Sequence, residues 1–243
     1  MSMRDPAALE TELRLRDEFF SIVAHELRNP LNALHLTLAG LLRAHGGKTP
    51  MPPEQVLARI TRASTQVTRL SKLVDDMLDV SRISAGRLNL QREEFDAAAV
   101  LSEVVERMRE QAEPDQISLS MPASLMMQSD RARFVQVATN LLSNAIQYGG
   151  QKPIEVRLDS EDQNIRLDVT DHGIGIAEKD HERIFKRFEK LGDDHPSTRF
   201  GLGLWISREV VSAMTGTIEV SSRLGEGSTF RVELPKASVI APS

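Results

Sequence analysis

Two stretches of apolar residues in heptad spacing constrain the fold of this chain more than any other feature. Over residues 9–42 only Pro30 interrupts a helical pattern, and after the helix-breaking residues 46–53 the same spacing resumes over residues 56–77. The two stretches predict an antiparallel helical hairpin. Its apolar seam consists of Phe20, Val23, Leu27, Leu31, Leu34, Leu38 and Leu41 on the first helix and of Val56, Ile60, Ala63, Val67, Leu70, Val74 and Met77 on the second.

A single hairpin of this kind leaves one apolar seam in contact with water. Pairing two hairpins into a four-helix bundle removes that exposure. The pattern therefore predicts a homodimer that forms through the hairpin.

The sequence changes character after residue 86. At 243 residues the chain has room for two domains, and short β-prone runs now alternate with helical patterns over residues 131–148 and 203–214. This predicts an α+β layer, with the junction near residues 87–94 and domains at 1–86 and 87–243. The expected strands are 117–121, 154–159, 165–170, 217–221 and 229–234.

Charge and composition exclude several classes of function. A net charge of -5 and a pI of 5.7 argue against nucleic acid as the main partner. The chain has no cysteine, so disulfides, thiolate metal sites and thiol nucleophiles are excluded. No run approaches the roughly 18 apolar residues of a spanning helix. We expect a cytoplasmic protein, or the cytoplasmic part of a membrane-bound receptor.

His25 lies on the first helix but away from its seam. At about 100° per residue it is turned roughly 160° from Leu27, so its imidazole is expected to be exposed. Glu26 adjoins it, and Asn29 lies one turn further along, before Pro30. Neutral imidazole attacks through one ring nitrogen while a carboxylate takes the proton from the other. The pattern predicts a nucleophilic histidine.

Residues 19–34, FFSIVAHELRNPLNAL, resemble the H box of the HisKA dimerisation and phosphotransfer domain of sensor histidine kinases. The resemblance implies that His25 accepts a phosphoryl group with the help of Glu26. It also implies transfer to the aspartate of a response-regulator receiver domain, and an upstream sensor domain or sensor protein. The family's Glu-x-x-Asn/Thr pattern, met by Glu26 and Asn29, favours a regulator-phosphatase activity in addition; otherwise Asn29 only suits the restricted backbone before proline.

Two glycine motifs and an asparagine pair indicate a nucleotide site in the second domain. Glycines at 173 and 175, and again at 201 and 203, let the backbone approach a ligand closely, and the second pair opens a helix whose N-terminus favours phosphate. Asp171 follows a strand, where its carboxylate can accept a hydrogen bond from an amino group. Asn140 and Asn144 are one turn apart on the 131–148 helix, and such oxygen ligands suit Mg²⁺.

The order of these motifs resembles the N, G1, F and G2 boxes of the GHKL ATPases in their histidine-kinase form. This implies an α/β-sandwich of the Bergerat type that binds ATP and Mg²⁺. Asn144 then ligates magnesium with the help of Asn140, Asp171 binds the adenine amino group, and residues 191–200 form the ATP lid. The implied nucleotide-binding residues are Asn140, Asn144, Tyr148, Asp171, Gly173, Gly175, Arg187, Gly201, Gly203 and Thr229.

The chain departs from the family pattern at two places. Gln147 stands where the N box usually has a lysine near the phosphates, and Arg199-Phe200 stand where a further glycine often precedes the second pair. Lys152 lies close to Gln147 in sequence, and Arg199 is able to reach a γ-phosphate.

Two other functions compete with the kinase. GHKL ATPases of the topoisomerase, mismatch-repair or chaperone kind use a glutamate to activate water, whereas position 140 is asparagine. The second competitor is a dimeric scaffold that binds nucleotide without catalysis. Autophosphorylation separates the kinase from both.

Overall fold

The computed structural model describes residues 6–45, 51–189 and 201–237, with the side chains of α1 described for residues 21 and 23–44. The chain forms two compact units, Met1–Leu78 and Asp79–Ser243, called here the hairpin unit and the sheet unit. No helix among the described residues is long and apolar enough to cross a membrane.

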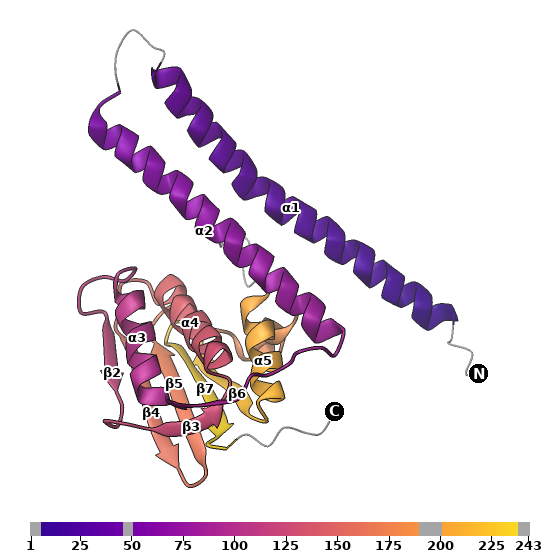
Figure 1. The fold of residues 1–243 in the computed structure, drawn as a ribbon, viewed down its shortest axis with the longest axis vertical. Coiled ribbons are helices and arrows are strands. Elements are labelled where there is room, and N and C mark those ends of the chain that lie inside the picture. The colour runs from indigo at the N-terminus through magenta and orange to yellow at the C-terminus, as the bar shows by residue number, and fades with distance from the viewer. Residues whose placement is uncertain (1–5, 46–50, 190–200, 238–243) are drawn as a thin grey trace. The chain divides into compact units, whose positions relative to one another are not determined.

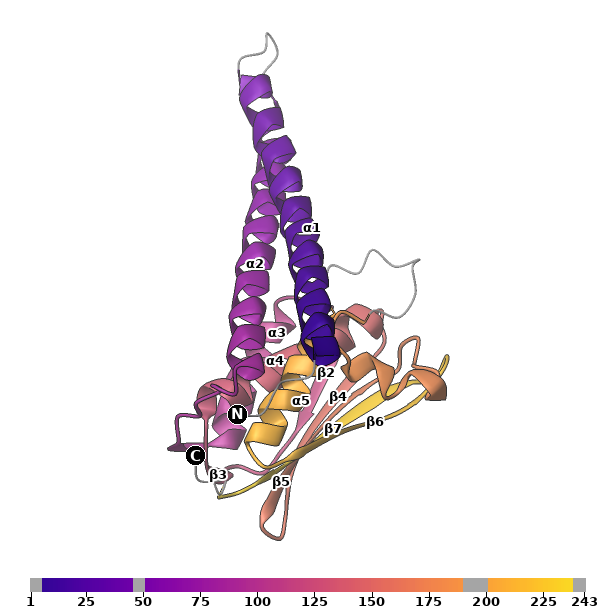
Figure 2. The same ribbon diagram turned by 90° about the vertical axis from the view of Figure 1, so that its right-hand side faces the viewer.

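The hairpin unit contains α1 (Pro6–His45) and most of α2 (Pro53–Ser84), which run antiparallel in Figures 1 and 2. The Arg59 side chain of α2 lies over Gly40 of α1, because a Cβ atom on Gly40 would lie 2.3 Å from the Arg59 guanidinium. Pro30 is buried inside α1, and Ala63 and Leu73 are buried on α2. The predicted hairpin is thus present.

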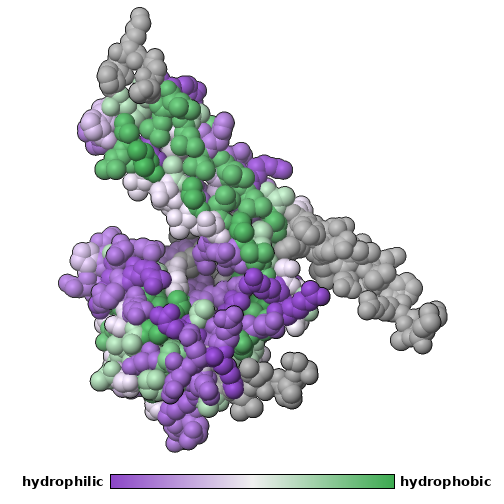
Figure 3. All heavy atoms as spheres, in the orientation of Figure 1, coloured by the Kyte–Doolittle hydropathy of each residue, from purple (hydrophilic) through white to green (hydrophobic). Residues whose placement is uncertain are grey.

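Much of the apolar surface of the hairpin stays in contact with solvent. Seam residues on both helices are about half exposed, among them Leu31 at 48%, Leu38 at 46% and Val67 at 49%. In Figure 3 apolar side chains gather along the hairpin on the face shown. One hairpin alone does not bury its seam.

The division between the units lies inside α2, before the predicted junction at residues 87–94. Asp79 explains this, because its buried carboxylate is held by the sheet unit. Arg133 Nη1 donates to both of its oxygens, at 2.8 and 2.9 Å, and Gln136 Nε2 donates to Oδ2 at 2.7 Å. The last turns of α2 are therefore bonded to the sheet unit.

The sheet unit is built on a five-stranded sheet in the order β2-β4-β5-β7-β6. Only β2 and β4 pair parallel, and the other neighbours are antiparallel. The strands of this sheet are β2 (Ile117–Ser120), β4 (Ile154–Glu161), β5 (Asn164–Asp171), β6 (Thr217–Arg223) and β7 (Gly227–Pro235).

Helices cover one face of this sheet. Figures 1 and 2 both show α3 (Ala97–Arg109), α4 (Arg131–Tyr148) and α5 (Gly203–Ala213) on the same side. Strand residues that face them are buried at alternate positions, as the period of two requires. The core of the sheet lies beneath the helices and includes Ile154, Val156, Leu158, Ile165, Leu167, Val169, Phe230, Val232 and Leu234.

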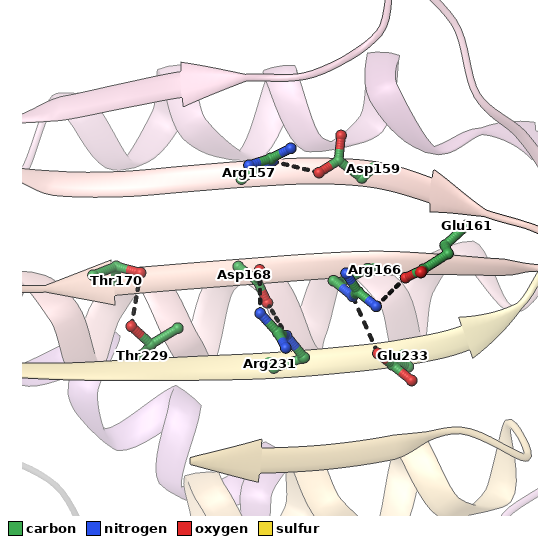
Figure 4. A network of polar contacts seen from close by, with 9 residues as sticks. All are labelled: Arg157, Asp159, Glu161, Arg166, Asp168, Thr170, Thr229, Arg231 and Glu233. Atoms are coloured by element: carbon green, nitrogen blue, oxygen red, sulfur yellow. Dashed lines mark hydrogen bonds and ion pairs between the residues drawn. The ribbon is translucent and has the colours of Figure 1, made fainter. Parts of the chain in front are cut away.

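The opposite face of the sheet is polar. Figure 4 shows its cross-strand pairs: Asp168 accepts from Arg231 at 2.8 and 3.0 Å, and Arg166 donates to Glu233 at 3.1 Å. Each pair joins residues directly opposite in the β5–β7 register. The strands therefore turn alternate side chains to a polar outer face and an apolar inner face. Only the residues that point to the inner face can reach a site among the helices.

The structure confirms the predicted combination of a helical hairpin with an α/β domain. It adds three elements that the pattern of residues 87–130 did not reveal: α3, and the short pair β1 (Glu93–Asp96) and β3 (Met126–Ser129). Two short 3₁₀ turns, Glu178–Asp180 and Arg183–Phe185, precede the predicted lid.

Candidate active site

Asp171 is the last residue of β5, and strand alternation turns it toward the helices. It shares the inner face with Ile165, Leu167 and Val169 and is 5% exposed. Gly173 N–H donates to its Oδ1 at 2.8 Å. Burial raises the pKa of Asp171, against the hydrogen bonds from Gly173 and Ser228 and the charges of His172 and Lys152. The site therefore contains a buried carboxylate with accepting capacity.

Ser228, rather than Thr229, lies beside this carboxylate. Ser228 is opposite Asp171 in the β5–β7 register and is buried, and its hydroxyl is 3.0 Å from that of Ser222 on β6. Thr229 points to the outer face, where its Oγ1 is 3.0 Å from Thr170 Oγ1, as Figure 4 shows. Thr229 therefore faces away from Asp171, because adjacent strand residues face opposite sides, and its contact with adenine stays a prediction.

The loop after Asp171 packs on the end of α4. A Cβ atom on Gly173 would lie 1.9 Å from the Tyr148 carbonyl oxygen, so only glycine fits there. Ile174 N–H donates to that same oxygen at 3.3 Å, and Gly175 adopts φ +66° against the Arg223 carbonyl. The predicted glycine motif thus joins the N-box helix to the Asp171 strand.

Asn140 and Asn144 are both buried on α4, at 5% and 9% exposure. Asn140 Nδ2 donates to Ser207 Oγ on α5 at 2.9 Å. Gly203, the first residue of α5, allows this approach, since a Cβ atom there would lie 2.3 Å from Asn140 Oδ1. Asn140 and the second glycine motif, far apart in sequence, therefore meet at the N-terminal turn of α5.

The segment before α5 is anchored to the same turn. Phe188 N–H donates to the Gly201 carbonyl at 2.9 Å, and Gly201 adopts φ +67°. The Arg187 guanidinium carbon is 4.0 Å from the centroid of the Trp205 ring, and its Nη2 donates to Ser84 Oγ at 3.1 Å. Burial lowers the pKa of Arg187. Arg187, predicted to bind nucleotide, thus connects α5 to the end of α2.

The residues at the two departures from the family pattern have different positions. Gln147 and Tyr148 are half-buried at the end of α4, whereas Lys152 is exposed and acts electrostatically on Asp171, the predicted adenine end. The predicted lid, residues 191–200 with Arg199, lies outside the described residues.

The phospho-acceptor group lies on α1 in the hairpin unit. His25 is exposed as predicted, and Asn29 Nδ2 lies 3.5 Å from its Nδ1. Glu26 is half-buried and interacts electrostatically with Arg69 of α2, whose pKa is lowered by burial. The three residues predicted from the H box share one region of the helix.

The sheet unit offers what a nucleotide with a divalent cation needs. Asp171 supplies a buried acceptor, and the first turn of α5 has no side-chain cap from Leu202, which suits a phosphate. Asn140 adds an amide oxygen beside that turn, and Asn144 lies one helical turn further along α4. The sequence analysis did not predict Ser207 and Ser228, although their spacing could have indicated both. Ser207 follows Gly203 by one helical turn. Ser228 is two residues before Phe230, so the two side chains point to the same face of the strand.

Two protein families match the chain. Residues 15–86 match the His Kinase A (phospho-acceptor) domain. Residues 129–238 match the histidine kinase-, DNA gyrase B- and HSP90-like ATPase family.

Individual relatives are similar along most of this chain. The adaptive-response sensory kinase SasA of Synechococcus sp. (strain JA-3-3Ab) is 32% identical over 96% of this chain and 62% of its own length. The chain spans 28% to 62% of the length of the curated relatives that it matches.

Solved structures agree with these relatives. The Acinetobacter baumannii histidine kinase AdeS is 28% identical with a TM-score of 0.67, over 87% of this chain and 98% of AdeS. Histidine kinase ThkA in complex with response regulator protein TrrA is 26% identical with a TM-score of 0.65, over 93% and 64%. The chain therefore belongs to the histidine kinases and joins a phospho-acceptor domain to an ATPase domain of the histidine-kinase type.

Proposed function

We propose that this chain uses ATP to phosphorylate its own His25 and then passes the phosphoryl group to an aspartate of a response-regulator receiver domain. The observation that carries the proposal is the exposed His25 on the phospho-acceptor hairpin of a chain whose other unit is an ATPase domain. The pairing of ThkA with a response regulator supports the choice of acceptor.

In the first step a nitrogen of His25 attacks the γ-phosphorus of ATP. The new N–P bond forms as the bond between that phosphorus and the bridging oxygen of ADP breaks, and ADP leaves. Glu26 takes the ring proton, which raises the nucleophilicity of the imidazole. In the second step an aspartate oxygen of the receiver domain attacks the same phosphorus. The O–P bond forms as the N–P bond breaks, and His25 regains the ring proton from Glu26.

The sheet unit holds the nucleotide during the first step. Asp171 accepts a hydrogen bond from the adenine amino group, and the N–H groups that open α5 at Gly203 receive the phosphates. Asn144, with Asn140, would ligate Mg²⁺, which neutralises phosphate charge when bound.

The hairpin unit supplies the dimer. Half-exposed seam residues on both helices would be buried when two hairpins associate into a four-helix bundle. We therefore propose a homodimer through the hairpin, with an upstream sensor as the source of the signal.

Hydrolysis of ATP by water is disfavoured by the chemistry at position 140. GHKL hydrolases place a glutamate there as a base, whereas Asn140 is a neutral amide that donates to Ser207. Transfer to histidine is the better supported fate of the phosphoryl group.

Incubation of the chain with γ-labelled ATP tests the proposal. The parent protein is expected to become labelled, and His25→Gln is expected to remain unlabelled. The label on the parent should be lost in acid, because the N–P bond is acid-labile. His35→Gln, an exposed histidine on the same helix, is the matched control and should label normally. Full labelling of His25→Gln, or acid-stable label, contradicts the proposal.

A second activity, dephosphorylation of the regulator, is favoured by the position of Asn29. Its amide lies one turn from His25 and can orient an in-line water through one acceptor and two donors. Decay of phosphorylated regulator in the presence of ADP should slow in Asn29→Ala, provided that the variant still autophosphorylates. Unchanged decay would leave Asn29 with a structural role before Pro30.

A further inference from the structure

A buried hydrogen bond joins the N-box helix to the helix of the second glycine motif. Asn140 Nδ2 on α4 donates to Ser207 Oγ on α5 at 2.9 Å, and the two residues are 5% and 2% exposed. Removing one partner of such a pair leaves a buried polar group unsatisfied. The contact therefore holds the Asn140 amide in one orientation.

That orientation decides which atom faces the nucleotide. With Nδ2 directed at Ser207, the amide oxygen lies over Gly203, where an added Cβ atom would be 2.3 Å away. Gly203 opens α5, and Leu202 before it provides no side-chain cap. The atom of Asn140 nearest to this helix end is therefore its amide oxygen, a hard ligand of the kind that Mg²⁺ prefers, at a position that suits phosphate.

We propose that Ser207 is a positioning residue of the nucleotide site. Its hydroxyl accepts a hydrogen bond from Asn140 Nδ2 and so keeps Asn140 Oδ1 at Gly203, where it would be available to a magnesium ion bound with the nucleotide. The proposal rests on the proposed function, because it requires that the sheet unit bind ATP together with magnesium.

A merely structural role would have a different signature. If Ser207 only packed α5 against α4, its loss would lower ATP affinity equally with and without magnesium. A positioning role affects the metal-dependent part alone, because the amide is then free to rotate and present Nδ2 to the cation. Replacing a group that orients a metal ligand costs about tenfold or more in metal affinity.

Calorimetric titration of the full chain with a non-hydrolysable ATP analogue, in EDTA and in magnesium chloride, separates the two roles. In Ser207→Ala the ratio of the two affinities should fall about tenfold while the affinity in EDTA stays unchanged. Ser207→Thr keeps the hydroxyl and should restore most of the ratio. Ser212→Ala, an exposed serine on the same helix, is the matched control and should resemble the parent.

Three results would overturn the proposal. The first is an unchanged ratio in Ser207→Ala, and the second is an equal loss of affinity with and without magnesium. The third is a Ser207→Thr protein that melts like the parent yet loses the ratio, because the hydroxyl would then not be responsible. A parent that shows no magnesium dependence overturns the proposed metal site as well, so the parent titration tells the two failures apart.

Discussion

At the scale of the residue, the candidate site consists of polar side chains at buried positions that apolar residues occupy elsewhere on the same strand or helix. Asp171 continues the buried alternation of β5, and Asn140 and Asn144 lie among the apolar residues of α4. Burying such groups costs free energy unless they are hydrogen-bonded. Asp171 shows that cost directly, since burial raises its pKa.

The raised pKa of Asp171 predicts how ATP binding depends on pH. Asp171 accepts most strongly as a carboxylate, so the affinity for ATP should fall as the pH is lowered through its raised pKa, which lies above the ordinary value of 3.8. Asp171→Asn should bind about 10 to 100 times more weakly at neutral pH and lose this dependence. Calorimetry from pH 5 to 8 measures the affinity and its pH dependence, and circular dichroism confirms folding. The same loss of affinity at low pH in the variant would contradict the assignment.

The same shift makes a prediction for stability. Because the pKa is raised in the folded state, the contribution of Asp171 to stability is greatest at low pH and is lost as pH rises through the folded pKa. At neutral pH the charged group weakens the fold, and Asp171→Asn should melt at a higher temperature than the parent. A lower melting temperature at pH 7 would show that the hydrogen bond from Gly173 outweighs desolvation.

Glu26→Gln tests the proton acceptor. The substitution removes the base next to His25 but no group of the sheet unit, so autophosphorylation should slow by about 100-fold while ATP affinity stays constant. Arg43→Gln is a suitable control, because Arg43 is exposed on α1 and donates to Ala39 of its own helix. Quench-flow labelling gives the rate, and a normal rate in Glu26→Gln would rule out the role.

At the scale of the element, the helix that ends the hairpin is shared between the units. The last turns of α2 carry Asp79, which Arg133 and Gln136 of α4 hold by hydrogen bonds of 2.7 to 2.9 Å. Ser84 accepts from Arg187, which stacks on Trp205 of α5. Both helices that carry nucleotide motifs are thus bonded to the end of α2.

Asp79→Ala is expected to destabilise the sheet unit by about 3 kcal/mol, because it leaves the partly buried Arg133 cation without its carboxylate. Asp75→Ala is the matched control, since Asp75 is an exposed acid on the same helix. Urea unfolding followed by the fluorescence of Trp205, the only tryptophan, measures the difference. Equal midpoints for the two variants would show that the bond contributes nothing.

Secondary structure was predictable where a helix or strand is long enough to show the spacing of its buried apolar residues. The helix expected over residues 131–148 is α4 with the same bounds, and each expected strand of the large sheet is present within a few residues. The pair β1 and β3 was not predictable, because four-residue strands are too short to show a period and exist through pairing with each other. The position of the boundary between the two units, inside α2, was not predictable either, because it depends on the contact of Asp79 with Arg133, which is distant in sequence.

At the scale of the whole molecule, the proposed dimer accounts for apolar surface that one chain leaves exposed. Leu38→Glu combined with Val67→Glu places charges in the seam and should give a monomer by sedimentation analysis, with unchanged ATP affinity because the sheet unit is untouched. Both residues are nearly half exposed, so the monomer itself should tolerate the change. Thr65→Glu, exposed on α2 and turned away from the seam, should remain dimeric.

The outcome for the double variant separates two explanations of the exposed seam. A monomer supports association through the hairpin. A stable dimer in the variant would show that the seam is not the interface, and would leave Leu38 and Val67 as exposed apolar residues of a single hairpin.

The sequence by itself determined the hairpin, the α/β layer and the exposure of His25, and it supplied most residues of the candidate site. Each depends on local periodicity or on a short motif, and both are readable along the chain. Tertiary structure decided which polar atoms meet. It replaced Thr229 by Ser228 beside Asp171, oriented Asn140 through Ser207, and bonded Asp79 to α4. These choices depend on register and packing between segments tens of residues apart, which no local pattern encodes.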